Sequence, residues 1–425
     1  MQGPTATREV VRRMTERFDI VAGLDVGTTK VCCVIAKRDG GPAVEILGTG
    51  LAPSLGSKRG MVVNIESTVQ SIVEAVREAE QMAGVEVGEV NVGIAGGHIK
   101  SMNSKGIVAI SSPDREITKR DIERCIEQAK AIALPVDREV LHVLPKEFAV
   151  DDQRAVRDPR GMVATRLEAE VHIVTGAITS AQNLVRSVNR ANLKVTRLVL
   201  EPLASARAVL TPDEMELGAA LVDMGGGTTD IAIFYEGSVR HTSVLAAGGD
   251  QVTRDLAVGL RTPRLAAEQI KQKYAVAMAS LVADDGVVEV ADVGGRRARM
   301  IDRSYIAEIV QARLEEIITL VGREISQSGY ADHLAAGIVL TGGCANMEGI
   351  ADLGEQIFNT PTRIGVPLGV TGLSESVADP IFATGVGLIL YDLPEGGRFH
   401  DGGDNDAVVF HKIFSQMKSW MENIF

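Results

Sequence analysis

Two short runs of glycine and threonine combine residue types that suit the binding of phosphate groups. The first run is DVGTTK at 25–30, and the second is DMGGGTTD at 223–230. Glycine lets backbone N–H groups approach an anion without a Cβ in the way, and the threonine hydroxyls add donors. Either run alone also fits an ordinary hairpin turn, but two copies favour a site that holds a polyphosphate from both sides. The predicted contacts are Gly27, Thr28, Thr29, Lys30, Gly225, Gly226, Gly227 and Thr228.

An aspartate opens each of these runs, at the end of the strand that precedes it. Asp25 and Asp223 therefore suit a Mg²⁺ ion, held through its water molecules because Mg²⁺ gives up water reluctantly. The signature G-x-x-x-x-G-K-[ST] is absent from the sequence, and we expect no helix directly after either turn. These two features exclude a P-loop and a Rossmann dinucleotide site.

A third glycine-containing segment, TGGCAN at 341–346, follows the apolar run AGIVL. Glycines between a buried strand and a helix allow a flat base and its ribose to lie against the backbone. Gly342, Gly343 and Asn346 are the predicted contacts of such a nucleoside. The same residues also suit a strand-to-helix turn that simply requires glycine, and the segment alone does not decide between the two.

The segments around these runs predict the elements that position them. Apolar strands flank both turns, so a strand–turn–strand unit occurs twice, as an internal duplication rather than a solenoid. Apolar residues at helical spacing predict helices between the strands, and PIFATGVGLILY at 380–391 predicts the last core helix. The other predicted helices cover 66–83, 118–133, 250–260, 265–279, 303–327 and 347–358.

The composition indicates a multidomain α/β protein of the cytoplasm. The chain has 425 residues, enough for several domains of ordinary size. Its net charge of −12 and its 4% aromatic content argue against a nucleic-acid partner. The four cysteines lack metal-ligand spacing and suit a reducing compartment. We find no apolar signal segment and no run long enough to span a membrane.

The end of the sequence is different in kind. Residues 394–408 are rich in glycine and acids and predict a linker, whereas 409–425 predict an amphipathic helix. Its apolar face comprises Phe410, Ile413, Phe414, Met417, Trp420, Met421 and Ile424. Such a helix beyond a linker suits an in-plane membrane anchor, with docking on this protein or a partner as the alternative. Lys412 and Lys418 against Glu422 leave little positive charge, so apolar insertion must dominate the binding.

Taken together, the motifs resemble one known family. The phosphate runs and the late TGG segment are similar to the actin/Hsp70/sugar-kinase ATPase superfamily. GLDVGTTKV, VNVGIAGGHIKSMNSKGIVAI, LEPLASARAVL, VDMGGGTTDIAIF, VLTGGCANMEGI, PTRIGVP and the terminal helix narrow the resemblance to the bacterial FtsA family. The resemblance covers residues 18–425, which is essentially the whole core in order.

The resemblance implies a fold and a division into parts. We expect an actin-like (ribonuclease H-like) two-lobed α/β fold with a duplicated core, and ATP with Mg²⁺ in the cleft between the lobes. The expected parts are an arm at 1–17, subdomain 1A at 18–87, 169–201 and 377–393, subdomain 1C at 88–168, subdomain 2A at 202–256 and 335–376, subdomain 2B at 257–334, the linker at 394–408 and the membrane helix at 409–425.

It also implies further site residues. Glu201 falls where superfamily members orient the attacking water, although a charge at a helix N-terminus before Pro202 explains it equally well. Gly248, before a helix, is consistent with one more N-terminus that faces the nucleotide. Glu268 and Lys271 match the helix that faces ribose and adenine, and the alternative is a solvent-exposed pair one turn apart.

The implied function is that of an adaptor in cell division. The chain would bind ATP, hydrolyse it slowly at most, polymerise, and tether FtsZ to the cytoplasmic face of the cell membrane at the septum. Subdomain 1C would serve self-assembly and later division proteins, and 2B would take the FtsZ tail. A basic cluster in 2B suits an acidic peptide, unless it is only a solvated edge: Arg296, Arg297, Arg299 and Arg303. The alternatives are a small-molecule kinase, a chaperone ATPase, or a relative of the pilus-assembly actins.

Overall fold

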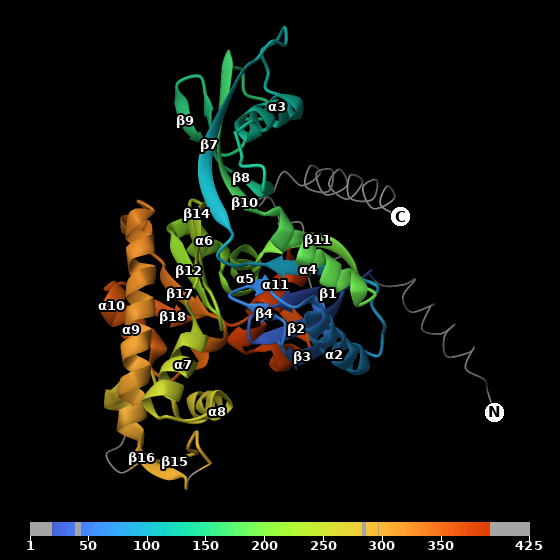
Figure 1. Cartoon of the computed structure of the whole chain (residues 1–425). Helices are drawn as coiled ribbons and strands as arrows, with labels where there is room; N and C mark the ends of the chain where they lie inside the picture. Colours follow the sequence, from blue (N-terminus) through green and yellow to red (C-terminus); the bar gives the residue numbers. More distant parts are fainter. Residues whose placement is uncertain (1–18, 39–43, 283–285, 296, 392–425) are drawn as a thin grey trace, which may run out of the picture.

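The computed structural model describes residues 19–38, 44–282, 286–295 and 297–391. Three sheets organise this part of the chain into two lobes and a small subdomain that stands above them in Figure 1. The arm at 1–17, Arg296, the linker and the terminal helix lie outside the described residues. Among the described residues, no helix combines the length and apolar character needed to cross a bilayer.

The first lobe is built on a six-stranded sheet in the order β11-β6-β1-β2-β3-β19. Its strands are β1 Asp19–Val26, β2 Lys30–Arg38, β3 Val44–Pro53, β6 Glu89–Ile94, β11 Lys194–Leu200 and β19 Val370–Gly372. The short hairpin β4 Ser57–Lys58 and β5 Met61–Val62 lies beside it, and its helices are α2 Ile65–Ala83, α4 Ile178–Arg190, α5 Glu201–Val209 and α11 Ala383–Leu390. β1 and β2 are antiparallel and end at the predicted turn, with Asp25 opposite Cys32.

The second lobe repeats this plan. Its sheet has the order β14-β13-β12-β17-β18, so β12 and β13 form the second strand–turn–strand unit, and β12 pairs in parallel with β17 as β1 does with β6. Its strands are β12 Ala219–Met224, β13 Thr229–Tyr235, β14 Ser238–Leu245, β17 Gly337–Thr341 and β18 Thr362–Ile364, with the separate hairpin β15 Val287–Val290 and β16 Arg299–Asp302. Its helices are α6 Pro212–Leu217, α7 Gly249–Gly259, α8 Arg264–Tyr274, α9 Arg303–Gln327 and α10 Ile350–Phe358. The predicted duplication is confirmed.

The small subdomain is an antiparallel sheet with one helix against it. The sheet has the order β7-β10-β8-β9. The strands are β7 Lys100–Ala109, β8 Arg138–Val150, β9 Gln153–Val156 and β10 Arg166–Ala177, and the helix is α3 Lys119–Lys130. This block begins after β6, which pairs with β1 and β11 in the first lobe, and extends to Ala177. The expected limits of subdomain 1C, 88–168, are therefore displaced from those of this sheet.

The helices predicted within the described residues are present, with shorter ends at several places. The helix expected over 118–133 is capped by Thr118 and ends at Lys130. The helix expected over 265–279 ends at Tyr274, because the chain becomes extended there and Val276 forms a bridge with Glu348. Short 3-10 turns cover Ala279–Leu281, Ala331–His333, Gly343–Asn346, Ser374–Val377 and Pro380–Phe382.

Candidate nucleotide-binding site

The two glycine–threonine turns meet at the junction of the lobes. A Cβ built on Gly226 would lie 2.4 Å from Cγ2 of Thr29, and one on Gly227 would lie 2.4 Å from Oγ1 of Thr28. The turns therefore touch through glycine backbone on one side and threonine side chains on the other, with no room for a larger residue. The predicted arrangement of two facing turns, one from each lobe, is present.

On the first-lobe side, Asp25 and Lys30 form a buried ion pair across the turn. Nζ of Lys30 donates to Oδ2 of Asp25 at 2.7 Å. Burial acts to lower the pKa of Lys30, but the carboxylate of Asp25 outweighs it and raises that pKa above its ordinary value. Lys30 is therefore a cation at neutral pH. It lies at the turn where a phosphate group would compete with Asp25 for it.

Asp223 is held by hydroxyl groups from two helices. Oδ2 of Asp223 accepts from Oγ of Ser205 at 2.7 Å and from Oγ1 of Thr384 at 3.3 Å. Ser205 lies on α5 and Thr384 on α11, so this carboxylate of the second lobe is positioned by both of them. Its other oxygen, Oδ1, faces Gly342, where a Cβ would approach it to 2.3 Å. Burial is the main cause that raises the pKa of Asp223.

Asp230 is a site residue that the sequence analysis missed. It lies directly opposite Asp223 in the β12–β13 hairpin and is 2% exposed. Its Oδ1 is buried without a hydrogen-bond partner among the described residues. Burial, and next the charge of Asp223, raise the pKa of Asp230 well above the usual value. The spacing of the two aspartates around a Gly-rich turn was the available signal, because a tight hairpin places its end residues opposite each other.

Glu201 completes a cluster of buried carboxyl groups. It is the first residue of α5, and its Cγ would lie 2.9 Å from a Cβ on Gly93, so it packs closely against β6. Burial, then the charges of Asp25, Asp230 and Asp223, raise the pKa of Glu201 well above its ordinary value. A small pocket lies beside it, lined also by Gly60, Gly93 and His98.

The cluster fits a hydrated cation better than a naked one. Among the described residues, no three His, Cys, Asp or Glu side chains converge closely enough to hold a metal ion by themselves. A Mg²⁺ ion would therefore keep water or phosphate oxygens among its ligands, as it usually does. Asp25, Asp223 and the unpaired oxygen of Asp230 supply the carboxylate chemistry that Mg²⁺ prefers, so the residues present fit this ion.

The third predicted segment lies next to the second turn. Gly342 has φ +81°, a left-handed conformation that favours glycine, and it begins the 3-10 turn 343–346. Nδ2 of Asn346 donates to Oδ1 of Asp379 at 2.7 Å. Gly248 lies against the same turn, since a Cβ there would be 2.5 Å from the carbonyl oxygen of Gly225. These segments therefore line one side of the lobe junction.

Glu268 and Lys271 are not a solvent-exposed pair. Nζ of Lys271 lies 2.8 Å from Oε2 of Glu268, and it also donates to the carbonyl of Gly249 at 3.2 Å and to Oγ1 of Thr253 at 2.9 Å. The Lys271 side chain is only 12% exposed. The pair thus connects α8 to the N-terminus of α7, directly beyond Gly248. Burial alone would raise the pKa of Glu268, but Lys271 lowers it.

The predicted partner-binding arginines are only partly free. Arg297 is exposed. Arg299 donates from Nη2 to the carbonyl of Leu260, and Arg303 from Nε to the carbonyl of Tyr274 at 3.1 Å. Both are half-buried and help to fasten the β15–β16 hairpin to the rest of the lobe. Arg296 and the apolar face of the terminal helix lie outside the described residues.

Comparisons with known proteins agree on one family. The model of "Cell division protein FtsA" matches residues 220–387, and that of the "SHS2 domain inserted in FTSA" matches 96–175. A cell division protein FtsA from Pseudomonas aeruginosa is 51% identical over 96% of this chain and 98% of its own length.

Solved structures show the fold. The PilM–PilN type IV pilus biogenesis complex matches with a TM-score of 0.64 at 17% identity, covering 88% of this chain and 99% of that one. MreB5 of Spiroplasma citri bound to ADP matches with a TM-score of 0.52 at 14% identity, covering 88% and 96%. The fold is actin-like, as predicted from the sequence, and it carries the small domain inserted in this family.

Proposed function

The chain belongs to the FtsA family of cell-division proteins, and from this premise we propose that it binds ATP with Mg²⁺ between its lobes, polymerises, and tethers FtsZ to the cell membrane. Its role in cell division and its actin-like architecture follow from the family. The ligand, the partners and the membrane attachment are the proposal. Family membership also argues against the small-molecule kinase, the chaperone and the pilus-assembly alternatives.

The observation that carries the proposal is the contact between the two turns beside buried carboxyl groups. The backbone N–H groups of Gly226 and Gly227 and the hydroxyls of Thr28 and Thr29 are suited to donate to phosphate oxygens, whereas the N–H of Gly225 donates to the carbonyl of Thr228 within the turn. Lys30 adds a cation. Asp25, Asp223 and Asp230 are suited to a hydrated Mg²⁺ ion, whose charge would offset the cost of burying several carboxylates together. A related fold, that of MreB5, carries ADP in its solved structure.

The remaining site residues support a nucleoside beside these phosphates. We propose that Gly342, Gly343 and Asn346 line the base and ribose, and that Gly248, Glu268 and Lys271 face them from the other side. The network of Lys271, Thr253 and Gly249 orients these groups before a ligand arrives. Glu201 is the residue we propose to position the attacking water, in a hydrolysis that is slow at most.

The lower end of the second lobe suits the acidic FtsZ tail. Exposed apolar side chains lie on α7, α8 and the β15–β16 region, next to the basic residues named above: Val258, Leu265, Val287, Val293 and Met300. Exposed apolar side chains in a segment that also holds the exposed Arg297 suit a peptide that carries both apolar and acidic residues. We propose this surface as the FtsZ site, the small subdomain as the site for self-assembly and later division proteins, and the terminal helix as the membrane anchor.

Calorimetry with a pair of glycine variants tests the nucleotide site. Gly226→Ala places a methyl group against Thr29, so it should weaken the binding of Mg²⁺–ATP by about tenfold or more. Gly88→Ala is the matched control, because a Cβ there meets no atom within 4 Å and the backbone of Gly88 is not left-handed. Gly88→Ala should bind as the unmodified protein does.

Two results would contradict the proposal. One is the absence of any Mg²⁺-dependent binding of adenine nucleotides to the unmodified full-length chain. The other is equal affinity of Gly226→Ala and Gly88→Ala, since the turn contact would then have no part in holding the ligand.

A further inference from the structure

A hydrogen bond joins the small subdomain to the residue that directly precedes α5. The backbone N–H of Leu200 donates to Nε2 of His142 at 3.0 Å. Leu200 is the last residue of β11 and directly precedes Glu201, whereas His142 lies on β8. Both residues are buried, with Leu200 0% and His142 3% exposed. Because a backbone N–H can only donate, Nε2 of His142 must be unprotonated, and the bond exists only with the neutral ring.

This bond holds the backbone directly before Glu201. On the other side, Glu201 packs against Gly93, which leaves no space for a Cβ. A movement of β8 therefore acts on the backbone one residue before Glu201. The sheet that carries His142 forms no strand pairs with either lobe sheet, but Leu144 on β8 and Val174 on β10 pack in the apolar core of the first lobe.

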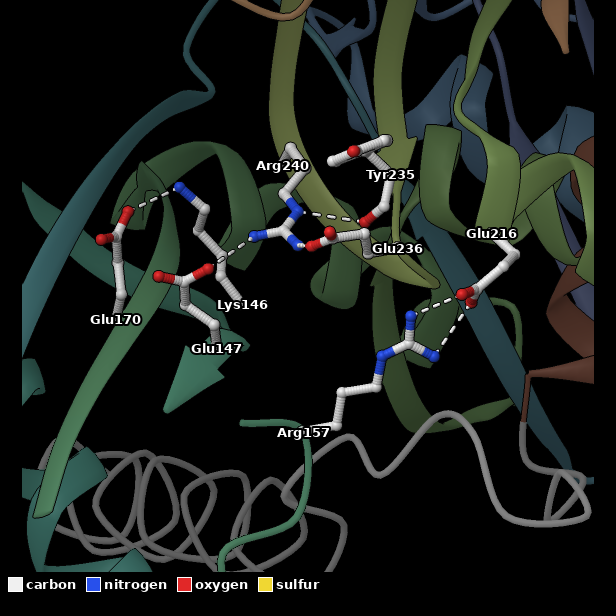
Figure 2. Close-up of polar contacts among 8 residues, drawn as sticks. All are labelled: Lys146, Glu147, Arg157, Glu170, Glu216, Tyr235, Glu236 and Arg240. Carbon is white, nitrogen blue, oxygen red and sulfur yellow. Dashed lines mark hydrogen bonds and ion pairs between the residues drawn. The ribbon is translucent and has the colours of Figure 1, made fainter. Parts of the chain in front are cut away.

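The small subdomain also makes polar contacts with the second lobe. Arg157, directly after β9, makes hydrogen bonds of 2.5 and 3.0 Å with the carboxylate of Glu216 on α6. Nη1 of Arg240 on β14 lies 3.5 Å from Oε2 of Glu147 on β8. Figure 2 shows both ion pairs, together with the bond from Lys146 to Glu170 within the small subdomain. We call the Arg157–Glu216 and Arg240–Glu147 pairs the docking pairs.

Two further bonds lie deeper in the same interface. Oγ of Ser101 on β7 donates to the carbonyl of Thr242 on β14 at 2.7 Å. Nε2 of His172 on β10 lies 2.9 Å from Oγ1 of Thr242. The insertion in the first lobe thus rests on the edge strand β14 of the second lobe. An interface of this polar kind forms and opens more readily than an apolar core does.

We propose that the small subdomain regulates the nucleotide site, and that His142 is the positioning residue through which its docking on the second lobe sets the orientation of Glu201. This inference rests on the proposed function, because it needs ATP between the lobes. A nucleotide that changes the angle between the lobes alters the docking pairs. By thermodynamic linkage, a shift of the small subdomain alters the affinity of the site for ATP relative to ADP and the rate at which the γ-phosphate is hydrolysed.

The first test removes the acceptor at position 142 in the full-length protein. His142→Leu should lower the single-turnover rate of Mg²⁺–ATP hydrolysis by about tenfold, since small misplacements of a water-positioning group cost up to about 100-fold. Its affinity for ADP should be unchanged. His142→Gln keeps an acceptor on the side chain and should stay within about threefold of the unmodified rate. In a Glu201→Gln background, His142→Leu should cause no further loss, because both changes act on one group.

The second test leaves the core intact and alters an exposed docking pair. Arg157→Glu and Glu216→Arg should each lower the rate by about two- to fivefold, the range expected for an exposed ion pair. The double swap Arg157→Glu with Glu216→Arg should restore the rate. Arg160→Glu is the matched control: Arg160 is a similarly exposed arginine that pairs with Asp158 inside the small subdomain, so its loss should leave hydrolysis unchanged.

The ratio of the ADP to the ATP dissociation constant gives a readout that needs no turnover. This ratio should fall in His142→Leu and in the single docking variants, and recover in His142→Gln and in the swap. Normal nucleotide binding with an unchanged rate and ratio in His142→Leu would overturn this inference alone, as would a swap that does not restore function. Absence of nucleotide binding by the unmodified protein would instead overturn the proposed function.

Discussion

At the scale of single residues, the site concentrates negative charge where water has little access. Asp223 and Asp230 lie opposite each other in one hairpin, and the charges of Asp25, Asp230 and Asp223 add to burial in raising the pKa of Glu201. Each carboxylate without a cation costs free energy in such a place. The buried carboxylates thus lower the stability of the protein without a cation. A cation that bound among them would be held more strongly for the same reason.

Asp230→Asn should therefore stabilise the nucleotide-free protein while it weakens Mg²⁺ binding. The folded state raises the pKa of Asp230, so it holds this proton more tightly than the unfolded chain does. The contribution of Asp230 to stability hence falls as pH rises from about 4 through the folded-state pKa, and asparagine removes that loss. A gain on the order of 1 kcal/mol would raise the Tm by roughly 2 °C in a protein of this size.

Calorimetry checks both halves of this prediction. Scanning calorimetry at pH 7.5 should give the higher Tm for Asp230→Asn without ligand, and titration should show a Mg²⁺ dependence of ATP binding weaker by about tenfold, typical of a lost charged contact. If Asp230→Asn is less stable without ligand, or if its ATP binding keeps the full dependence on Mg²⁺, then Asp230 takes no part in binding the cation.

The residue scale also shows what the sequence can and cannot specify. Asp25, Asp223 and the threonines were predictable because the turn that positions them is local. Asp230 was within reach, since a hairpin fixes its partner. Ser205 and Thr384 were not, because their contact with Asp223 joins segments far apart in the chain and depends on how two helices cross.

At the scale of elements, the crossing of α5 and α11 is the closest helix contact near the site. A Cβ on Gly387 would lie 1.8 Å from the carbonyl oxygen of Ala204. Gly387→Ala should therefore destabilise the protein by about 1–3 kcal/mol or more, the usual cost of overpacking a core. Denaturant unfolding measures this change.

Gly322 on α9 provides the contrasting helical glycine. A Cβ there would lie 3.4 Å from Cδ1 of Phe358, which is ordinary contact. Gly322→Ala should be neutral or stabilise by up to about 1 kcal/mol through helix propensity. Equal effects of Gly387→Ala and Gly322→Ala would mean that the two helices can move apart freely, against the packing described here.

The interface of β10 with β14 should make the protein sensitive to acid. Burial, and then the charges of His241 and Lys146, lower the pKa of His172 to about 3. Since the unfolded chain takes up this proton near pH 6.5, stability is lost as pH falls below 6.5, by up to about 1.4 kcal/mol per pH unit. His172→Gln should flatten the dependence of Tm on pH between pH 6.5 and 4.5. His333→Gln, which changes an exposed histidine, should follow the unmodified protein. Parallel Tm profiles for the unmodified protein, His172→Gln and His333→Gln would contradict this prediction.

Element boundaries were predicted less well than element types. The helix over 303–327 agrees with the periodicity of its sequence, because its apolar face is long and continuous. The strand β7 was missed since most of its outward positions are exposed and polar, and its place is set by pairing with β10. The end of α8 at Tyr274 depends on a bridge to Glu348, a contact with no local signal.

At the scale of the whole molecule, Figure 1 shows two lobes and the small subdomain that stands above them. The lobes share the site at their turns, and the small subdomain touches both through His142 and the docking pairs. On the proposal made above, the nucleotide, the angle between the lobes and the small subdomain would be linked in one equilibrium. A filament contact made through the small subdomain would belong to the same equilibrium.

Membrane attachment is the property that would turn such an assembly into a tether. The apolar face predicted for 409–425 could contribute on the order of 5–10 kcal/mol at a lipid interface, enough for reversible binding by one chain. Polymerisation would add anchors to one particle and raise its avidity without new contacts. Removal of 409–425 should therefore abolish co-sedimentation with liposomes, with and without ATP.

Single charges on opposite faces of the predicted helix give the sharper form of this prediction. Trp420→Glu places a carboxylate on the apolar face and should reduce pelleting severely, whereas Ser419→Glu places it on the polar face and should reduce it little. Because the helix has little net positive charge, zwitterionic and anionic liposomes should bind similarly, and added salt should have a small effect. Equal pelleting of Trp420→Glu and Ser419→Glu, or full pelleting of the truncated chain, would show that membrane contact lies elsewhere in the molecule.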